Sequence, residues 1–214
     1  MHQATTSGAF FALLKRDLML AYRHRNELLN LLRSYHTRYM DEVSYARRAI
    51  AYIEQNEDVF ERAASVHVTG SAWVVSPDRE KVLLMHHRKY GHWFQMGGHS
   101  DGDPDVINVA LKECAEETGV DPAHITLIDS TIFDVDLHDV PQIGQVQAHG
   151  HIDIRFLVEI DDSVEIPGNH ESHEVKWFSL YQVMQMNRFR STYRMLEKTR
   201  AMRNPVNVLR RRTA

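Results

Sequence analysis

Cysteine is almost absent from this sequence, because Cys114 is the only one among 214 residues. A single cysteine cannot form an intrachain disulfide. Cys114 lies on the predicted apolar face of a helix, where a cysteine usually behaves as a small buried hydrophobic residue. We therefore interpret it as structural rather than as a nucleophile.

Long hydrophobic runs are also missing. The apolar run from Ala9 to Leu14 is interrupted by Lys15, Arg16 and Asp17, and no small-residue cleavage site follows it. Nothing approaches the roughly twenty apolar residues that a membrane-spanning helix needs. We expect a cytoplasmic protein that does not interact with membranes.

The sequence has no excess of positive charge. Its formal net charge is −4 at pH 7, whereas proteins that bind nucleic acids through the phosphate backbone usually carry a clear positive excess. We expect no general nucleic-acid binding, so an anionic substrate must be captured locally by a metal ion or a few basic side chains. The hydrophobic share of 43% is typical of a globular protein, and the length fits one domain plus an extension.

Proline and glycine are both absent from residues 9–69. Apolar residues recur there at helical spacing and predict two or three helices. The residues of this pattern are Leu14, Leu18, Tyr22, Leu28, Leu29, Leu32, Tyr45, Ile50 and Ile53. We predict that residues 1–64 form a helical N-terminal extension with a structural or dimerising role, so a homodimer is one form that we expect.

The pattern changes at Val66, where strand-forming runs begin. Such runs predict strands over residues 66–75, 81–88, 125–140, 148–160 and 171–180. A helical stretch is predicted from Leu180 to Met202. The predicted organisation is therefore the extension, a catalytic domain over residues 65–202 and a basic tail over residues 203–214, which contains Arg210, Arg211 and Arg212.

A short helix is the centre of the predicted catalytic domain. Asp103 has the character of an N-cap, Pro104 is suited to the first helical position, and Gly119 is suited to the position after the last turn. These signals predict a helix from Pro104 to Thr118.

Three glutamates gather on the polar face of this helix. Glu113, Glu116 and Glu117 are spaced i, i+3 and i+4, so they repel one another unless a cation lies between them. Mg²⁺ is the natural occupant when a phosphate supplies the remaining ligands, and a solvated acidic face is the alternative. A turn at Gly97 and Gly98 favours the metal, because glycine reaches conformations that let a backbone carbonyl or N–H approach a metal or phosphate.

This spacing resembles the Nudix box, the signature of the Nudix hydrolases: Gly, five residues, Glu, seven residues, then Arg-Glu-aliphatic-any-Glu-Glu-any-Gly-aliphatic. The residues in register are Gly98, Lys112, Glu113, Cys114, Glu116, Glu117, Gly119 and Val120. Two positions depart from the pattern, because Pro104 replaces the first Glu and Lys112 replaces the Arg. The glutamates that hold the metal in the family are retained, so these departures affect how well the site works. Asp103 and Asp105 are the neighbouring carboxylates that could replace the missing glutamate, although neither is at its position.

The resemblance implies an α/β/α sandwich with a mixed β-sheet, here preceded by the helical segment. The GGHSDGD and HGHIDIRF stretches look similar to a bacterial subgroup with such a leader. The implied activity is a Mg²⁺-dependent pyrophosphohydrolase, with Mn²⁺ as a substitute, that cleaves a nucleoside diphosphate derivative or a related diphosphate. The implied metal ligands are Glu113, Glu116 and Glu117 with the carbonyl of Gly97 or Gly98, while Lys112 orients the glutamates.

Two candidates remain for the general base: a glutamate of the helix, or a glutamate in the last predicted strand. Glu171 and Glu174 lie there, ahead of an aromatic run, and Glu174 has the better spacing to Trp177. Nudix proteins often place a carboxylate of such a late stretch near the metal.

Four further side chains are predicted to bind substrate: Arg88, Lys89, His99 and Arg155. Arg88 and Lys89 follow the second predicted strand and either meet phosphates or face water. Arg155 shares one face of the strand over residues 148–160 with His149, His151 and Asp153. The sequence leaves three interpretations of this face: a wall that faces the substrate, a transition-metal site, or an ordinary solvent-exposed strand surface.

Two other classes of function compete with hydrolysis. A Nudix-like domain that binds a nucleotide without cleaving it is favoured by Pro104. A prenyl diphosphate isomerase is less well supported, because that reaction commonly uses a cysteine and Cys114 lies on the apolar helix face.

Overall fold

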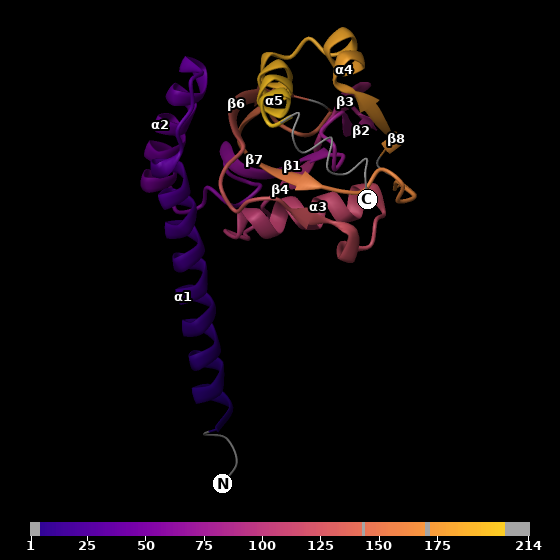
Figure 1. Cartoon of the computed structure of the whole chain (residues 1–214). Coiled ribbons are helices and arrows are strands. Elements are labelled where there is room, and N and C mark those ends of the chain that lie inside the picture. The colour runs from indigo at the N-terminus through magenta and orange to yellow at the C-terminus, as the bar shows by residue number, and fades with distance from the viewer. Residues whose placement is uncertain (1–4, 143, 170–171, 204–214) are drawn as a thin grey trace.

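The computed structural model describes residues 5–142, 144–169 and 172–203. In chain order its elements are α1 (Thr5–Ser34), α2 (Met40–Gln55), β1 (Val66–Val75), β2 (Lys81–His87), β3 (His92–Phe94), β4 (Met96–His99), α3 (Val106–Thr118), the 3₁₀-helix η1 (Pro122–His124), β5 (Thr126–Leu127), β6 (Asp134–Val140), β7 (His149–Glu159), β8 (Ser172–Ser179), α4 (Leu180–Met186) and α5 (Arg190–Ala201). Figure 1 shows α3 below the sheet and α4 and α5 above it. Among the helices in these ranges, none has the length and apolar character that crossing a membrane requires.

The strands form one mixed, eight-stranded sheet with β1 near its centre. β1 runs parallel to β7, so that Thr69 lies opposite Asp153, 84 residues later in the chain. β2 and β4 pair antiparallel with β1, β5 and β6 pair antiparallel with β7, and β3 and β8 pair with β2. This pairing joins segments from the whole domain around two long strands.

One face of the sheet, which we call the α3 face, is covered by α3 and α2. An added Cβ at Gly70 of β1 would lie 2.8 Å from the Val106 carbonyl oxygen, so the absence of a side chain there lets α3 approach the strand closely. The buried side chains on this face include Ala110 and Cys114 of α3, Ala49 and Ile53 of α2, and Val68, Ala72, Val74, Ile152, Ile154 and Phe156 of β1 and β7.

The opposite face, which we call the α5 face, is covered in part by α4 and α5. Trp73, Leu84 and Leu157 pack there against apolar side chains of the two helices. The indole Nε1–H of Trp73 donates to Thr199 Oγ1 at 2.9 Å, which satisfies the polar atom of a fully buried ring.

Among the side chains that the structure describes, the buried apolar residues of helix α1 lie in its second half. Leu28, Leu29 and Leu32 are buried, whereas Leu18 and Tyr22 are 73% and 69% exposed. Figure 1 shows the first half of α1 extending away from the rest of the protein. Because α2 shares its buried core with the sheet, the predicted boundary between the extension and the catalytic domain, residues 64–65, stays a prediction.

The predicted fold class is confirmed: a mixed sheet lies between helices and two helices precede it. The runs predicted as strands over residues 66–75, 81–88 and 148–160 coincide with β1, β2 and β7 within one residue at each end. The run over residues 125–140 is instead split into β5 and β6, while the stretch from Leu180 to Met202, predicted to be helical, contains the two helices α4 and α5. The tail beyond residue 203, with its three arginines, lies outside the described residues.

The predicted start of the central helix is wrong. α3 begins at Val106, and Asp105 is its N-cap, because the Asp105 side chain accepts a hydrogen bond from the Asn108 N–H. Asp103 accepts hydrogen bonds from the Asp105 N–H and the Asn108 side chain, so Pro104 lies before the helix. The predicted end is confirmed, since Gly119 is left-handed with φ of 70°.

The predicted turn at the glycine pair is also wrong. Gly97 and Gly98 lie in β4 and pair with Ser71 and Gly70 of β1. The chain turns later, at Asp101 and Gly102, whose φ angles are 46° and 88°. The glycine pair is therefore needed for close packing in a strand rather than for an unusual backbone conformation.

Candidate functional site

Glu117 of α3 is tied to the glycine strand by a backbone hydrogen bond. The Gly97 N–H donates to Glu117 Oε2 at 2.8 Å, and Glu117 is only 4% exposed. Gly97 has no space for a side chain, because an added Cβ would overlap the Ser71 side chain and lie 2.9 Å from the Gly70 carbonyl oxygen. A buried carboxylate thus has one oxygen fixed by the strand.

Glu113 lies against the other glycine of the pair. An added Cβ at Gly98 would be 2.5 Å from the Glu113 carboxyl carbon. Glu113 and Glu117 are one helical turn apart, so both carboxylates reach the same short strand. The structure therefore brings together four predicted metal-site residues: Gly97, Gly98, Glu113 and Glu117.

Glu116 has a different environment from these two glutamates. Its side chain is 57% exposed and lies 3.9 Å from Lys112 Nζ, with Lys112 itself 62% exposed. The pair is an exposed i, i+4 contact, which contributes little to stability. Glu116 therefore lies at the outer edge of the site, and Lys112 contacts this glutamate.

The atoms gathered at β4 suit a hard divalent cation. Two carboxylates approach this strand, Glu117 through the Gly97 N–H and Glu113 in the space that Gly98 leaves, and carboxylate and carbonyl oxygens are the ligands that Mg²⁺ prefers. Cys114, between the two glutamates, points into the core and is fully buried. Burial and the Glu117 charge raise the pKa of its thiol to about 12, which supports its interpretation as a structural residue.

A comparison with protein families gives a match to the NUDIX domain over residues 66–198, more than half of the chain. The chain belongs to the Nudix family. The match begins at β1 and ends within α5, so the Nudix domain includes the glycine strand, the helix α3 and every strand of the sheet. The expectation of a pyrophosphohydrolase acting on phosphorus-containing anhydrides is supported by this membership.

Individual Nudix proteins resemble the chain over the same region. The bis(5'-nucleosyl)-tetraphosphatase [asymmetrical] of Mus musculus is 28% identical over 120 residues, which cover 56% of this chain and 77% of the mouse protein. A C. elegans Ap4A hydrolase in a binary complex has a TM-score of 0.51 at 17% identity and covers 63% of this chain and 95% of its own. A MutT protein from Methanosarcina mazei Go1 has a TM-score of 0.50 at 18% identity, with 65% and 96% covered. The structural matches show a shared fold.

Arg155 lies in a buried ionic network within the Nudix domain. It is 3% exposed, and its guanidinium donates to Asp153 Oδ2 at 2.7 Å, Asp134 Oδ1 at 3.1 Å and Asp136 Oδ2 at 3.2 Å. Burial opposes its charge, but the three carboxylates raise its pKa. In the structure the partners of Arg155 are these three carboxylates. Its contact with substrate therefore stays a prediction.

Arg88, Lys89 and Glu174 lie elsewhere on the Nudix domain. Arg88 and Lys89 are exposed after β2, where Lys89 Nζ lies 5.5 Å from the centre of the Tyr90 ring. Glu174 of β8 is 53% exposed and lies 3.3 Å from Lys176 Nζ.

Glu174 also lies on a different face of the sheet from Glu113 and Glu117. It alternates with Val175 and Trp177, which pack in the core beneath α3, so its side chain is on the α5 face. Glu171, the other predicted base, lies outside the described residues.

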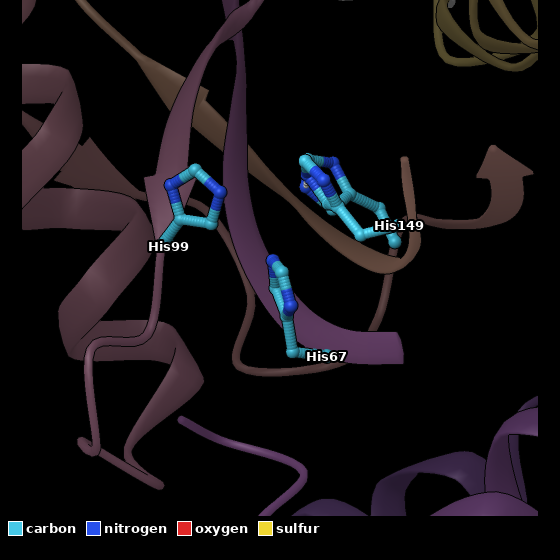
Figure 2. A group of neighbouring side chains, drawn as sticks. His67, His99 and His149 are labelled. Carbon is cyan, nitrogen blue, oxygen red and sulfur yellow. Dashed lines mark hydrogen bonds between the residues drawn. The ribbon is translucent and has the colours of Figure 1, made fainter. Parts of the chain in front are cut away.

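His99 belongs to a group of histidines on the α5 face. Its neighbour Gly98 faces Glu113, so the His99 side chain points to the other side of the sheet. Figure 2 shows His67, His99 and His149 around a common space, and His151 completes the group. Burial, followed by the charge of Arg62, lowers the pKa of His99 to about 4.

His67, the buried member of this group, was not predicted from the sequence as a site residue. A histidine in a strand has no local signal that separates it from any other histidine. Only the pairing of β1 with β7 and β4 shows that His67 lies beside the other three rings.

Proposed function

We propose that the protein is a Mg²⁺-dependent pyrophosphohydrolase that cleaves a nucleoside diphosphate derivative. The observation that carries this proposal is the placement of Glu113 and Glu117 against Gly97 and Gly98. This arrangement gathers two carboxylates at a strand whose backbone is open to close approach. It suits a cation that binds a diphosphate.

The comparisons support the substrate class. The mouse relative is named for its action on a bis(5'-nucleosyl) tetraphosphate, and the match covers 77% of its length. We propose the same kind of substrate for this chain: two phosphates joined as an anhydride and attached to a nucleoside. Cytoplasmic location, Mn²⁺ as a substitute metal and the absence of general nucleic-acid or membrane binding remain part of the proposal.

The chain's own residues would position the reaction. Gly97 N–H orients Glu117, and Glu113 is held over Gly98, so both carboxylates can hold Mg²⁺ before substrate arrives. When bound, Mg²⁺ neutralises charge on the phosphoryl oxygens and favours ionisation of a water. A glutamate of α3 would then accept the proton as water attacks phosphorus and the anhydride P–O bond breaks. The α3 glutamates are better placed for this than Glu174, which lies on the opposite face.

A domain that binds a nucleotide without hydrolysing it is the second candidate. Pro104 favours this candidate, because a proline occupies the position of the first glutamate of the Nudix box. In the structure Asp103 and Asp105 accept hydrogen bonds that shape the loop around Pro104, just before α3. These carboxylates are occupied in shaping the loop and do not reproduce the missing glutamate at its position.

The test is a substrate panel with the purified full chain. The panel contains a dinucleoside tetraphosphate, a nucleoside diphosphate sugar and a nucleoside triphosphate, each with Mg²⁺, with Mn²⁺ and with excess chelator. We expect metal-dependent release of a nucleoside phosphate from at least one compound. Absence of release from every compound, together with a rise in melting temperature when one is added, would support the binding domain instead.

A further inference from the structure

Four histidines meet at one end of β1, β4 and β7. The parallel pairing of β1 and β7 places His67 opposite His151, and the antiparallel pairing of β1 and β4 places His99 opposite Thr69, two residues after His67. His149 lies two residues before His151 and shares its face. One nitrogen from each of the four rings lies within 4.8 Å of the others.

The hydrogen bonds of two rings fix where their lone pairs are. His67 Nδ1 lies 2.9 Å from the Ala64 carbonyl oxygen, and His149 Nδ1 lies 2.8 Å from the Gln147 carbonyl oxygen. A carbonyl oxygen only accepts, so both Nδ1 atoms carry the proton and both Nε2 atoms present lone pairs. Metal-binding histidines commonly use a backbone carbonyl in this way to hold the ring.

His67 Nε2 is the atom that most needs a partner. The His67 side chain is 1% exposed, and among the described residues no group donates a hydrogen bond to Nε2. An unsatisfied buried acceptor is destabilising, because it has lost its hydrogen bonds to water and gained none from the protein. Contact with the neighbouring rings alone leaves this acceptor unpaired, whereas a cation between the rings satisfies it.

The distances fit a tetrahedral ion. His149 Nε2 and His151 Nε2 are 3.1 Å apart. Two imidazole nitrogens bound to one tetrahedral Zn²⁺, with Zn–N of about 2.0–2.1 Å, are separated by about 3.3 Å. The longest separation in the group, up to 4.8 Å, requires only a small side-chain movement toward the centre.

We propose that His67, His99, His149 and His151 bind one Zn²⁺ ion. Nitrogen ligands favour Zn²⁺ over Mg²⁺, which prefers oxygen, so this site is chemically distinct from the carboxylates at α3. Four protein ligands make a closed, structural site rather than a catalytic one.

The ion would join the ends of three strands. His99 directly follows Gly98, so a metal bound to His99 would also fix the end of β4, against which Glu113 lies. The zinc site would therefore stabilise the strand that carries the proposed catalytic site, from the opposite face of the sheet.

Zinc binding is tested by titrating the full, chelator-treated chain with Zn²⁺ in the presence of excess Mg²⁺. Excess Mg²⁺ competes for the carboxylates but not for the imidazoles. Competition with a chromophoric chelator should give one Zn²⁺ per chain, and free Zn²⁺ at a hundredfold excess over Kd should raise the melting temperature by roughly 5–10 °C. Co²⁺ should give the intense visible absorption of a tetrahedral complex.

The variants are His99→Ala and His149→Ala, whose side chains are partly exposed, with His124→Ala as the matched control. His124 is exposed on η1 and lies outside the group. Each cluster variant should weaken Zn²⁺ binding at least tenfold, while the control should bind as the parent does. Circular dichroism checks that each variant is folded, and His151→Gln replaces any that is not. Equal Zn²⁺ affinity in the parent and the folded cluster variants, or a parent that binds less than one Zn²⁺ per chain, would overturn the proposal.

Discussion

At the scale of single residues, the proposed catalytic site depends on two glutamates with unequal surroundings. Glu117 is almost fully buried and hydrogen-bonded to a backbone N–H, while Glu113 lies half-buried against Gly98. Glu116, between them in the sequence, is exposed. The three were predicted from one motif, and the structure separates them by depth.

The neutral histidines give a prediction for pH. Burial lowers the pKa of His99 to about 4 and that of His151 to about 2, and it also lowers the pKa of His67. Above pH 6.5 these rings are neutral in both the folded and the unfolded chain, so their contribution is fully present there. As the pH falls below 6.5, only the unfolded chain takes up their protons, and the free energy of unfolding of the metal-free chain should fall.

The free energy of unfolding should change by at most about 1.4 kcal/mol per pH unit for each ring. The change should be smaller than this limit, because the rings of His99 and His151 are partly exposed to solvent. Urea unfolding at pH 6.5 and 5.5, with chelator present, measures it. His151→Asn should reduce the slope. A free energy of unfolding that stays level or rises between these pH values would contradict the account.

At the scale of elements, the contact between β4 and α3 determines the site. Glu113 and Glu117 are one helical turn apart and both reach β4, whereas Glu116, which was predicted together with them, is exposed. Local sequence did not predict that the glycines form a strand, since a Gly-Gly pair usually indicates a turn. β4 is stabilised by pairing with β1, a contact with residues more than twenty positions earlier.

The two glycines should respond differently to alanine. At Gly98 the added Cβ meets the flexible end of the Glu113 side chain, so Gly98→Ala should displace this carboxylate and lower hydrolysis at least tenfold in a chain that still folds. At Gly97 the Cβ meets the Gly70 backbone and the Ser71 side chain, so Gly97→Ala should destabilise the fold by about 1–3 kcal/mol. Thermal unfolding and initial rates, measured for both variants, test this difference. A stable but inactive Gly97→Ala together with a destabilised Gly98→Ala would contradict it.

Other elements could be predicted only in part. The strands β1, β2 and β7 have apolar runs that show them directly, and Gly119 marks the end of α3. Asp153 could be placed beside Arg155 from the strand pattern, but its other buried partners, Asp134 and Asp136, could not, because they come from β6 and meet Arg155 only through the sheet pairing. The polar face of β7 was recognised, but its division into histidines at one end and an ionic network at the other required the structure.

At the scale of the whole molecule, a buried ionic network joins the N-terminal helices to the Nudix domain. Glu42 of α2 and Asp134 of β6 are both fully buried, and Lys198 of α5 lies between them, with Nζ 2.6 Å from Glu42 Oε1 and 2.8 Å from Asp134 Oδ2. Arg194 donates to both oxygens of Asp134, at 2.7 and 2.8 Å. Burial opposes the charge of Asp134, but these cations hold its pKa below the usual value.

Breaking this network should be costly. Asp134→Asn leaves Arg155, Arg194 and Lys198 with one fewer buried negative charge, and removal of one partner from such a network typically costs about 3–5 kcal/mol. Glu54→Gln is the matched control, because its ion pair with Arg33 is exposed and should contribute less than about 1 kcal/mol. Urea unfolding curves compare the two, and similar losses would contradict a central role for the network. The predicted homodimer stays a prediction at this scale.

The central claim is that Glu117 and its neighbours form the catalytic site. Its most direct test is the initial rate of the full chain, of Glu117→Gln and of Glu165→Gln on whichever compound of the panel is hydrolysed. Glu165 is an exposed glutamate outside α3 and serves as the matched control. Glutamine retains an oxygen that can accept from Gly97 N–H, so the fold should persist while charge for the metal is lost. We predict at least a hundredfold lower kcat/KM for Glu117→Gln and an unchanged value for Glu165→Gln, whereas near-normal turnover by a folded Glu117→Gln would contradict the proposed site.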